Sequence, residues 1–266
     1  MHHPIITLTT DFGLKDPYVA EMKAVILGLC PNATIVDVTH NVEKFNVRMG
    51  AYILACASKF FPKGAIHVAV VDPSVGTQRR AVMVQTEKAF YIGPDNGVLA
   101  LALKNQKIKH VYEIRNKRFM MPKISNTFHG RDVFAPVAAY LANGTSPAEF
   151  GPEISGIAIP RFARVVRQKN ALVGEVLHVD NFGNVITNFG WKELRHVGVN
   201  VGDFVQMEIE NVSLRLRFCR FYAEVEPQKP LTLVGSHNFL EIAVNQGDAA
   251  ETFKIKAGDK IKLYRS

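Results

Sequence analysis

The stretch IITLTTDFGLKDPYVAEMKAVILGL, residues 5–29, contains the unit that decides the fold. Residues 5–10 form a near-continuous run of β-branched and aliphatic side chains, which is typical of a strand buried on both faces. From Pro17 to Leu29 the apolar residues return at helical spacing, and Asp16 is placed to cap this helix. A buried strand followed by a helix indicates a parallel sheet covered by helices.

The same alternation continues through the first half of the chain. Strand patterns are predicted over residues 34–39, 65–71, 81–86, 89–93 and 110–114, and helix patterns over residues 47–60, 96–103 and 132–141. This rhythm predicts an α/β fold with an N-terminal, mostly parallel sheet flanked by helices on both faces.

The rhythm changes after Gly144, where prolines and glycines become frequent, and past Ala171 short alternating runs replace the helical spacing. These runs predict strands over residues 173–179, 184–188, 204–209, 213–218, 231–234, 240–244 and 260–264. We therefore predict an α/β domain over residues 1–155, a linker over 156–170 and a smaller C-terminal all-β barrel domain over 171–266.

The amino-acid composition indicates a globular protein and argues against a disordered chain or a membrane-spanning helix. The 266 residues are 47% hydrophobic, which is enough for a core, and no apolar run approaches the ~20 residues of a membrane helix. The N-terminus lacks a signal-peptide pattern, and the 3 cysteines are odd in number and stand in apolar surroundings. We expect a cytoplasmic protein with reduced thiols and no membrane partner.

The formal net charge of +8 raises the question of nucleic acid binding. The excess is spread over both halves of the chain, and in the one local cluster, between Lys104 and Lys123, aromatic residues are not interleaved throughout the basic ones. A solvated face is the simpler reading, and we expect no nucleic acid partner.

Polar residues follow three of the predicted parallel strands, where ligands collect in such sheets. Asp11 follows the first strand, Thr39 and His40 end the second, and Asp72 follows the third. A carboxylate such as Asp11 can accept hydrogen bonds from two ribose hydroxyls, or it can simply close a turn. Because no glycine-rich phosphate motif occurs, a nucleoside is a better candidate ligand than a nucleotide phosphate.

Three further segments each allow two interpretations, one functional and one purely structural. His129 stands at the start of a predicted helix, where it is either a neutral functional imidazole or a structural side chain. The turns at residues 180–184 and 235–238 are flanked by aromatic residues, so they could bind a base, although turn chemistry alone explains both. GxSxG and HExxH motifs are absent, so serine esterase and zinc peptidase chemistry lack their signatures.

An ordered set of motifs resembles one enzyme family. The motifs are TTDFG at 9–13, IVDVTH at 35–40, VDPSVGTQRR at 71–80, GPDNG at 93–97, TFHGRDVF at 127–134, DNFGNVITN at 180–188 and GSHNFLEIAVNQ at 235–246. Together they resemble the S-adenosylmethionine hydroxide adenosyltransferases, adenosine-forming hydrolases related to fluorinating and chlorinating enzymes. Each motif alone is weak, whereas the ordered set spans nearly the whole chain.

The resemblance implies a function and a set of site residues. It implies hydrolysis of S-adenosyl-L-methionine to adenosine and L-methionine, by in-line attack of an activated water or hydroxide at ribose C5′, with no metal and no cofactor. It implies a homotrimer whose active sites lie at subunit interfaces. The family's catalytic set falls on Asp72, Arg79 and His129, and its substrate-binding positions fall on Asp11, Asp16, Phe45, Asp180, Phe182, Asn184, Ser236 and Gln246.

Two alternatives remain open at this point. A halogenase would cradle a halide with hydroxyl and backbone donors, but the matching positions here are Val75 and Gly130, and Asp72 would repel an anion. The other alternative is a protein that binds adenosine or S-adenosylmethionine without efficient chemistry. It would keep Asp11 and Asn184 as ligand contacts and leave the catalytic set as structural polar residues.

Overall fold

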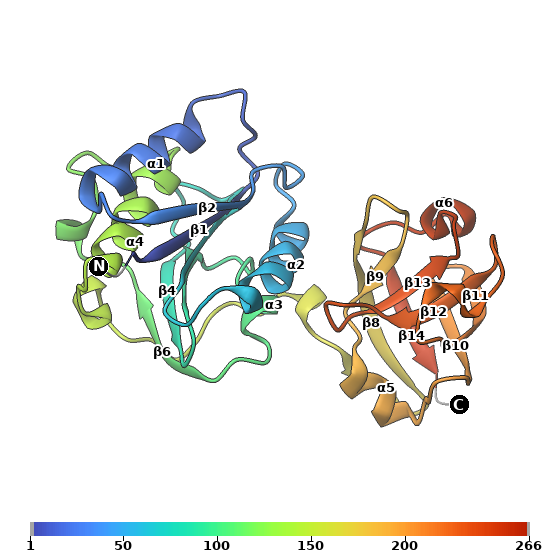
Figure 1. The fold of residues 1–266 in the computed structure, drawn as a ribbon. Helices are drawn as coiled ribbons and strands as arrows, with labels where there is room; N and C mark the ends of the chain where they lie inside the picture. Colours follow the sequence, from blue (N-terminus) through green and yellow to red (C-terminus); the bar gives the residue numbers. More distant parts are fainter. Residues whose placement is uncertain (1–2, 265–266) are drawn as a thin grey trace. The chain divides into compact units, whose positions relative to one another are not determined.

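A computed structural model of the chain describes residues 3–264 (Figure 1). The chain divides into two compact units, residues 1–160 and 161–266. We describe each unit by itself.

The N-terminal unit is built on one six-stranded sheet with the order β2-β1-β3-β5-β4-β6. Its strands are β1 (Ile5–Thr10), β2 (Thr34–Thr39), β3 (Ile66–Val70), β4 (Ala81–Thr86), β5 (Phe90–Pro94) and β6 (Ile108–Glu113). The strands β2, β1, β3 and β5 pair in parallel, while β4 runs antiparallel to both of its neighbours. The mostly parallel sheet that the alternating pattern predicts is therefore confirmed.

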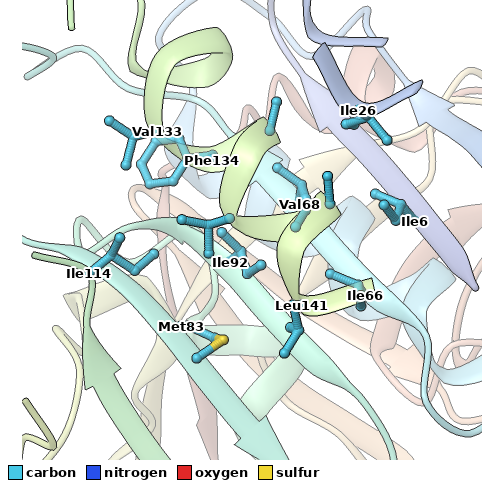
Figure 2. Close-up of a cluster of buried hydrophobic side chains, with 14 of the residues drawn as sticks. Ile6, Ile26, Ile66, Val68, Met83, Ile92, Ile114, Val133, Phe134 and Leu141 are labelled. Carbon is cyan, nitrogen blue, oxygen red and sulfur yellow. The ribbon is translucent and has the colours of Figure 1, made fainter. Parts of the chain in front are cut away.

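Helices cover both faces of this sheet (Figure 1). They are α1 (Tyr18–Leu29), α2 (Val47–Ala57), α3 (Ala100–Leu103) and α4 (Ala135–Ala142), with short 3₁₀ turns at Ser58–Phe60, Lys117–Phe119 and Pro147–Phe150. On one face α1 and α4 pack over Ile6, Ile66 and Val68 (Figure 2). On the other face α2 and α3 pack over a second apolar cluster that includes Ala69 and Val84.

Two helix starts differ from the sequence-based expectation. Within the part of the chain that the structure describes, no side chain caps α1, because Pro17 itself already has helical dihedral angles. The prediction that Asp16 caps this helix is therefore wrong. The helix predicted from residue 132 begins earlier, with a π-helical turn over Gly130–Phe134 directly after His129. π-helical turns are rare in proteins, and those that occur often lie at functional sites.

The C-terminal unit is an antiparallel, nearly closed barrel. Its path is β11-β10-β14-β8-β9-β13-β12, with β7 paired to β8. The strands are β7 (Val166–Arg167), β8 (Ala171–Val179), β9 (Val185–Thr187), β10 (Phe204–Ile209), β11 (Val212–Arg217), β12 (Pro230–Val234), β13 (Leu240–Val244) and β14 (Lys260–Tyr264). A bridge between Phe218 and Thr232 brings the two ends of the path together. The predicted all-β barrel class is confirmed.

Short helical elements of the C-terminal unit have no counterpart in the predicted pattern. They are α5 (Trp191–Val197), α6 (Ala249–Phe253) and 3₁₀ turns at Arg161–Ala163 and Tyr222–Glu224. Elements of this length contain at most two helical turns, so the spacing of their apolar residues is too short to reveal the 3.6-residue period of a helix in the sequence. Within residues 3–264, no helix combines the length and the apolar character that crossing a membrane requires.

Candidate active site

Arg79 joins the two other members of the expected catalytic set. Its Nε and Nη2 atoms donate to Asp72 Oδ2 at 2.9 and 2.6 Å, and Nη2 also lies 2.8 Å from His129 Nδ1. The side chains of Arg79 and Asp72 are only 9% and 4% exposed, so this ion pair is largely shielded from water. The structure thus brings Asp72 and Arg79, which share the loop after β3, together with His129 from a segment 50 residues further along the chain.

The chemistry of guanidinium fixes the protonation of His129. Because arginine has donors and no acceptor, His129 Nδ1 must accept the bond from Nη2, and the ring proton of the neutral imidazole lies on Nε2. Burial lowers the pKa of His129, and the neighbouring Arg79 charge lowers it further, against a smaller opposing effect of Asp72. His129 is therefore a neutral group at physiological pH.

The loop after β3 positions Asp72. The Ser74 hydroxyl donates to Asp72 Oδ1 at 3.2 Å, and the Asn96 amide donates to the Val71 carbonyl at 2.8 Å. Gly76 has a φ of +79°, and a Cβ there would overlap the Asn126 carbonyl oxygen. Glycine at this position therefore lets the loop after β3 lie against the segment that leads to His129.

A buried carboxylate holds the segment around His129. Asp132 is 1% exposed and accepts hydrogen bonds from the Ser125 backbone N–H and from Arg131 Nε, at 2.8 and 2.7 Å. Burial alone would raise the pKa of Asp132, but the bonds from Arg131 and Ser125 hold it below its ordinary value. Arg131 also donates to Glu21 of α1 at 2.7 Å, so the π-helical turn is anchored to the helix layer.

Asp11 lies near Asp72 in the same unit. Its Oδ2 atom accepts a hydrogen bond from the Phe45 backbone N–H at 2.9 Å. Burial raises the pKa of the Asp11 carboxyl and the Asp72 charge adds to this effect, while the backbone N–H of Phe45 opposes it. Phe45 has a φ of +65°, which is strained for a non-glycine residue, and the residue is 68% exposed. The expected ribose carboxylate and the expected stacking ring are thus joined by one hydrogen bond, whereas Asp16 lies exposed in the loop before α1.

The C-terminal unit carries the remaining expected site residues on two turns and a strand end. Asp180 closes its turn by accepting bonds from the backbone N–H groups of Phe182 and Asn184 and from the Asn184 amide, each at 2.9 Å. Phe182 is left 78% exposed at the tip. Ser236 lies exposed in the turn before β13, and Gln246 follows β13 with a φ of +54°.

Glu241 is a buried carboxyl that the sequence analysis does not single out. It is 6% exposed in β13 and accepts a hydrogen bond from the Tyr222 hydroxyl at 2.9 Å. Burial raises the pKa of Glu241, and the Asp180 charge raises it further. A Cβ on Gly235 would overlap the Glu241 carboxylate, so the turn that bears Ser236 lies directly against it. The available signal was a charged residue inside the otherwise apolar strand sequence LEIAV.

The described part of the chain contains no group of three or more histidine, cysteine or acidic side chains that could hold a metal ion. Cys30, Cys56 and Cys219 are buried, and none of them forms a disulfide within the described residues.

Two family models match the chain in order. The SAM hydroxide adenosyltransferase N-terminal domain matches residues 6–151, and the C-terminal domain of the same family matches residues 174–262. The chain belongs to the SAM hydroxide adenosyltransferase family. The resemblance drawn from the sequence motifs is therefore confirmed.

Several individual proteins are similar to this chain over nearly its full length. An (R)-S-adenosyl-L-methionine hydrolase from Thermus thermophilus is 38% identical over 96% of this chain and 97% of its own. A fluorinase from Actinopolyspora mzabensis is 27% identical over 99% and 98%. A crystal structure of an uncharacterized conserved protein from Thermotoga maritima has a TM-score of 0.87 at 37% identity, covering 98% of this chain and 100% of that chain.

Proposed function

We propose that this enzyme hydrolyses S-adenosyl-L-methionine, as its (R)-epimer at sulfur, to adenosine and L-methionine. The observation that carries the proposal is the shielded Asp72–Arg79–His129 contact, which provides one carboxylate, one fixed cation and one neutral imidazole around a single point. Relatives named as hydrolases of this substrate, with 33–38% identity over the whole chain, support it.

The reaction needs an aligned nucleophile more than it needs an acid. When water attacks C5′, the new O–C5′ bond forms as the C5′–S bond breaks, and the departing electron pair neutralises the sulfonium. Because the leaving group becomes a neutral thioether, no proton has to be delivered to it. Alignment of the attacking oxygen can supply up to ~7–11 kcal/mol of the barrier reduction.

The proton that leaves the attacking water needs an acceptor within the site. His129 Nδ1 already receives the Arg79 N–H, and Asp72 Oδ2 receives two Arg79 bonds. Asp72 Oδ1 has one longer contact, with the Ser74 hydroxyl at 3.2 Å, so it is the oxygen that we assign as general base. Arg79 and His129 would then orient the carboxylate, and the proton would pass from Asp72 to solvent.

The substrate-binding roles follow the family resemblance. Asp11 would accept hydrogen bonds from the ribose hydroxyls beneath the exposed ring of Phe45. Phe182, Asn184 and the backbone near Gln246 would contact the adenine. Asp16, Asp180 and Ser236 would hold the methionine portion, whose ammonium group favours negative charge. To these we add Glu241, whose carboxyl lies close enough to Asp180 for the two to interact.

We also propose a homotrimer in which each active site combines the N-terminal unit of one subunit with the C-terminal unit of its neighbour. Mixing Asp72→Asn subunits with Asn184→Ala subunits would test this arrangement. If sites are shared, mixed trimers regain activity, because one kind of interface carries both wild-type halves. If each chain builds its own site, the mixture stays inactive. We expect no metal, cofactor or nucleic acid partner, and we expect the enzyme to work in the cytoplasm.

Product analysis tests the proposed function directly. Purified enzyme with substrate, in buffers with and without chloride and fluoride, should release adenosine and methionine at the same rate in each. A 5′-halogenated nucleoside would instead identify a halogenase. Substrate that stays bound and intact through long incubation would identify a binding protein.

A further inference from the structure

His40 is a buried histidine that the proposed chemistry does not use. It follows β2, is 3% exposed, and lies between two polar side chains. Its Nδ1 atom is 2.8 Å from Thr10 Oγ1, and its Nε2 atom is 3.0 Å from Asp37 Oδ1. The Nε2 contact is not aligned as a hydrogen bond, so it is mainly electrostatic. Asp37 Oδ2 is held in turn by Lys23 of α1 at 2.6 Å.

Donor and acceptor chemistry gives this chain of contacts a direction. A carboxylate attracts the protonated nitrogen, so in the neutral ring the proton lies on Nε2 beside Asp37, and Nδ1 is an acceptor. The Thr10 hydroxyl therefore donates to His40 Nδ1. Its oxygen remains free to accept the Phe12 backbone N–H at 3.3 Å. The contacts from Asp37 to Phe12 are thus mutually consistent.

The same two loops are joined by their backbones. Gly13 N donates to the His40 carbonyl at 2.8 Å, and Val42 N donates to the Thr10 carbonyl at 3.3 Å. Asp11 lies between Thr10 and Phe12, and the Thr10 hydroxyl spans this position by contacting His40 on one side and the Phe12 backbone N–H on the other. The direction of the Asp11 side chain therefore depends on a turn that His40 stabilises through its contacts with Thr10 and Gly13.

We propose that the Asp37–His40–Thr10 chain is a positioning device for Asp11, which sets the selectivity of this site for ribose hydroxyls. The inference rests on the proposed function, in which Asp11 binds the ribose. His40 and Thr10 act here as positioning residues, because neither is assigned a contact with the substrate.

The fold supplies a matched control in the same sheet. Thr7 and His67 are paired across β1 and β3, and His67 Nδ1 lies 2.8 Å from Thr7 Oγ1. Thr7 and Thr10 are both fully buried, so valine at either position removes a hydroxyl of equal burial with little change of shape. Thr7 lies in mid-strand and does not border the Asp11 turn.

The test compares binding of adenosine and 2′,3′-dideoxyadenosine, by calorimetry on the full-length protein. Wild type should favour adenosine by at least ~10-fold, since hydrogen bonds to a charged group are lost in the analogue. Thr10→Val should reduce this preference at least ~3-fold, and Thr10→Ser should restore it. Thr7→Val should keep the wild-type preference despite a similar loss of thermal stability. With substrate, Thr10→Val should raise KM more than it lowers kcat.

Two outcomes overturn the inference. If Thr10→Val keeps the wild-type preference, or if Thr7→Val loses as much, the chain of contacts does not position Asp11. Should Thr10→Val fail to fold, His40→Gln with His67→Gln as its control applies the same comparison. Asp11→Asn separates this result from the proposed function: if wild type itself shows no preference, or Asp11→Asn retains it, the ribose role of Asp11 is wrong.

Discussion

Arg79 Nη2 lies 2.8 Å from His129 Nδ1, and this contact requires a neutral imidazole. The same nitrogen donates to Asp72 Oδ2 at 2.6 Å, so one guanidinium orients both partners. The arrangement assigns separate tasks to the three side chains. In the proposed mechanism Asp72 accepts the proton through Oδ1, while Arg79 and His129 hold the carboxylate in place.

Arg79→Lys should reduce kcat by ~10²–10³-fold with little change in adenosine affinity. A lysine ammonium can approach Asp72, but it cannot present two parallel N–H groups to one carboxylate and a third to His129. Steady-state kinetics and adenosine calorimetry measure the two quantities. Arg80→Lys is the control. Arg80 is the next residue in the chain, and its Nε and Nη2 atoms both donate to Asp95, as those of Arg79 do to Asp72. Equal losses in both variants would contradict a special role of Arg79.

Asp72→Asn should reduce kcat by ~10³–10⁴-fold, because the amide cannot accept the proton of the attacking water. It should also change how adenosine binding depends on pH. The Asp72 charge raises the pKa of Asp11, so its removal lowers that pKa. The acid limb of adenosine binding should therefore move to lower pH in Asp72→Asn. An unchanged or higher midpoint would show that the two carboxylates do not interact.

His129 should produce an acid limb in the pH profile of kcat/KM. Protonation of Nδ1 removes the acceptor for Arg79, and burial with the Arg79 charge lowers the pKa of His129. The limb should consequently fall below ~6.5, the ordinary value for histidine, with activity lost as pH decreases through it. His129→Gln can still accept the Arg79 N–H through its amide oxygen, so it should keep more activity than His129→Ala and lack this limb. A limb that persists in His129→Gln belongs to another group.

His67 should make the N-terminal unit sensitive to acid. Burial lowers its pKa to about 4, so between pH ~6.5 and 4 the unfolded chain binds a proton that the folded chain does not. The free energy of unfolding should therefore fall as pH decreases, by ~2 kcal/mol between pH 7 and 5. Urea unfolding at fixed protein concentration measures this change. His67→Gln should reduce the dependence on pH, and an unchanged slope would place its source in other groups.

The architecture was largely predictable, because buried strands and amphipathic helices leave periodic patterns. The run at residues 5–10 and the helix ending at Leu29 lie where the pattern places them. The lack of a side-chain cap on α1 was not predictable from local sequence, since Pro17 adopts helical angles itself and leaves Asp16 outside the helix. The five-residue helix α6 is too short to show a period.

The site was predictable only in part. Ordered motifs identify Asp72, Arg79 and His129, but no local pattern shows that Arg79 lies between the other two, because that contact joins residues 50 positions apart. The proposed role of His40 could not be predicted from the sequence either, because the contact with Thr10 depends on the pairing of β1 with β2. Glu241 was not predicted as a site residue, because its significance depends on its contacts with Tyr222 and Asp180, which only the folded structure brings beside it.

The most direct measurement of the central claim follows the oxygen atom. Wild-type enzyme turned over in ¹⁸O-labelled water should place one label in the 5′-hydroxyl of adenosine and none in methionine, with Asp72→Asn nearly inactive in the same assay. Adenosine that forms without label, or label incorporation that is unaffected by Asp72→Asn, would contradict attack at C5′ by a water molecule that Asp72 activates.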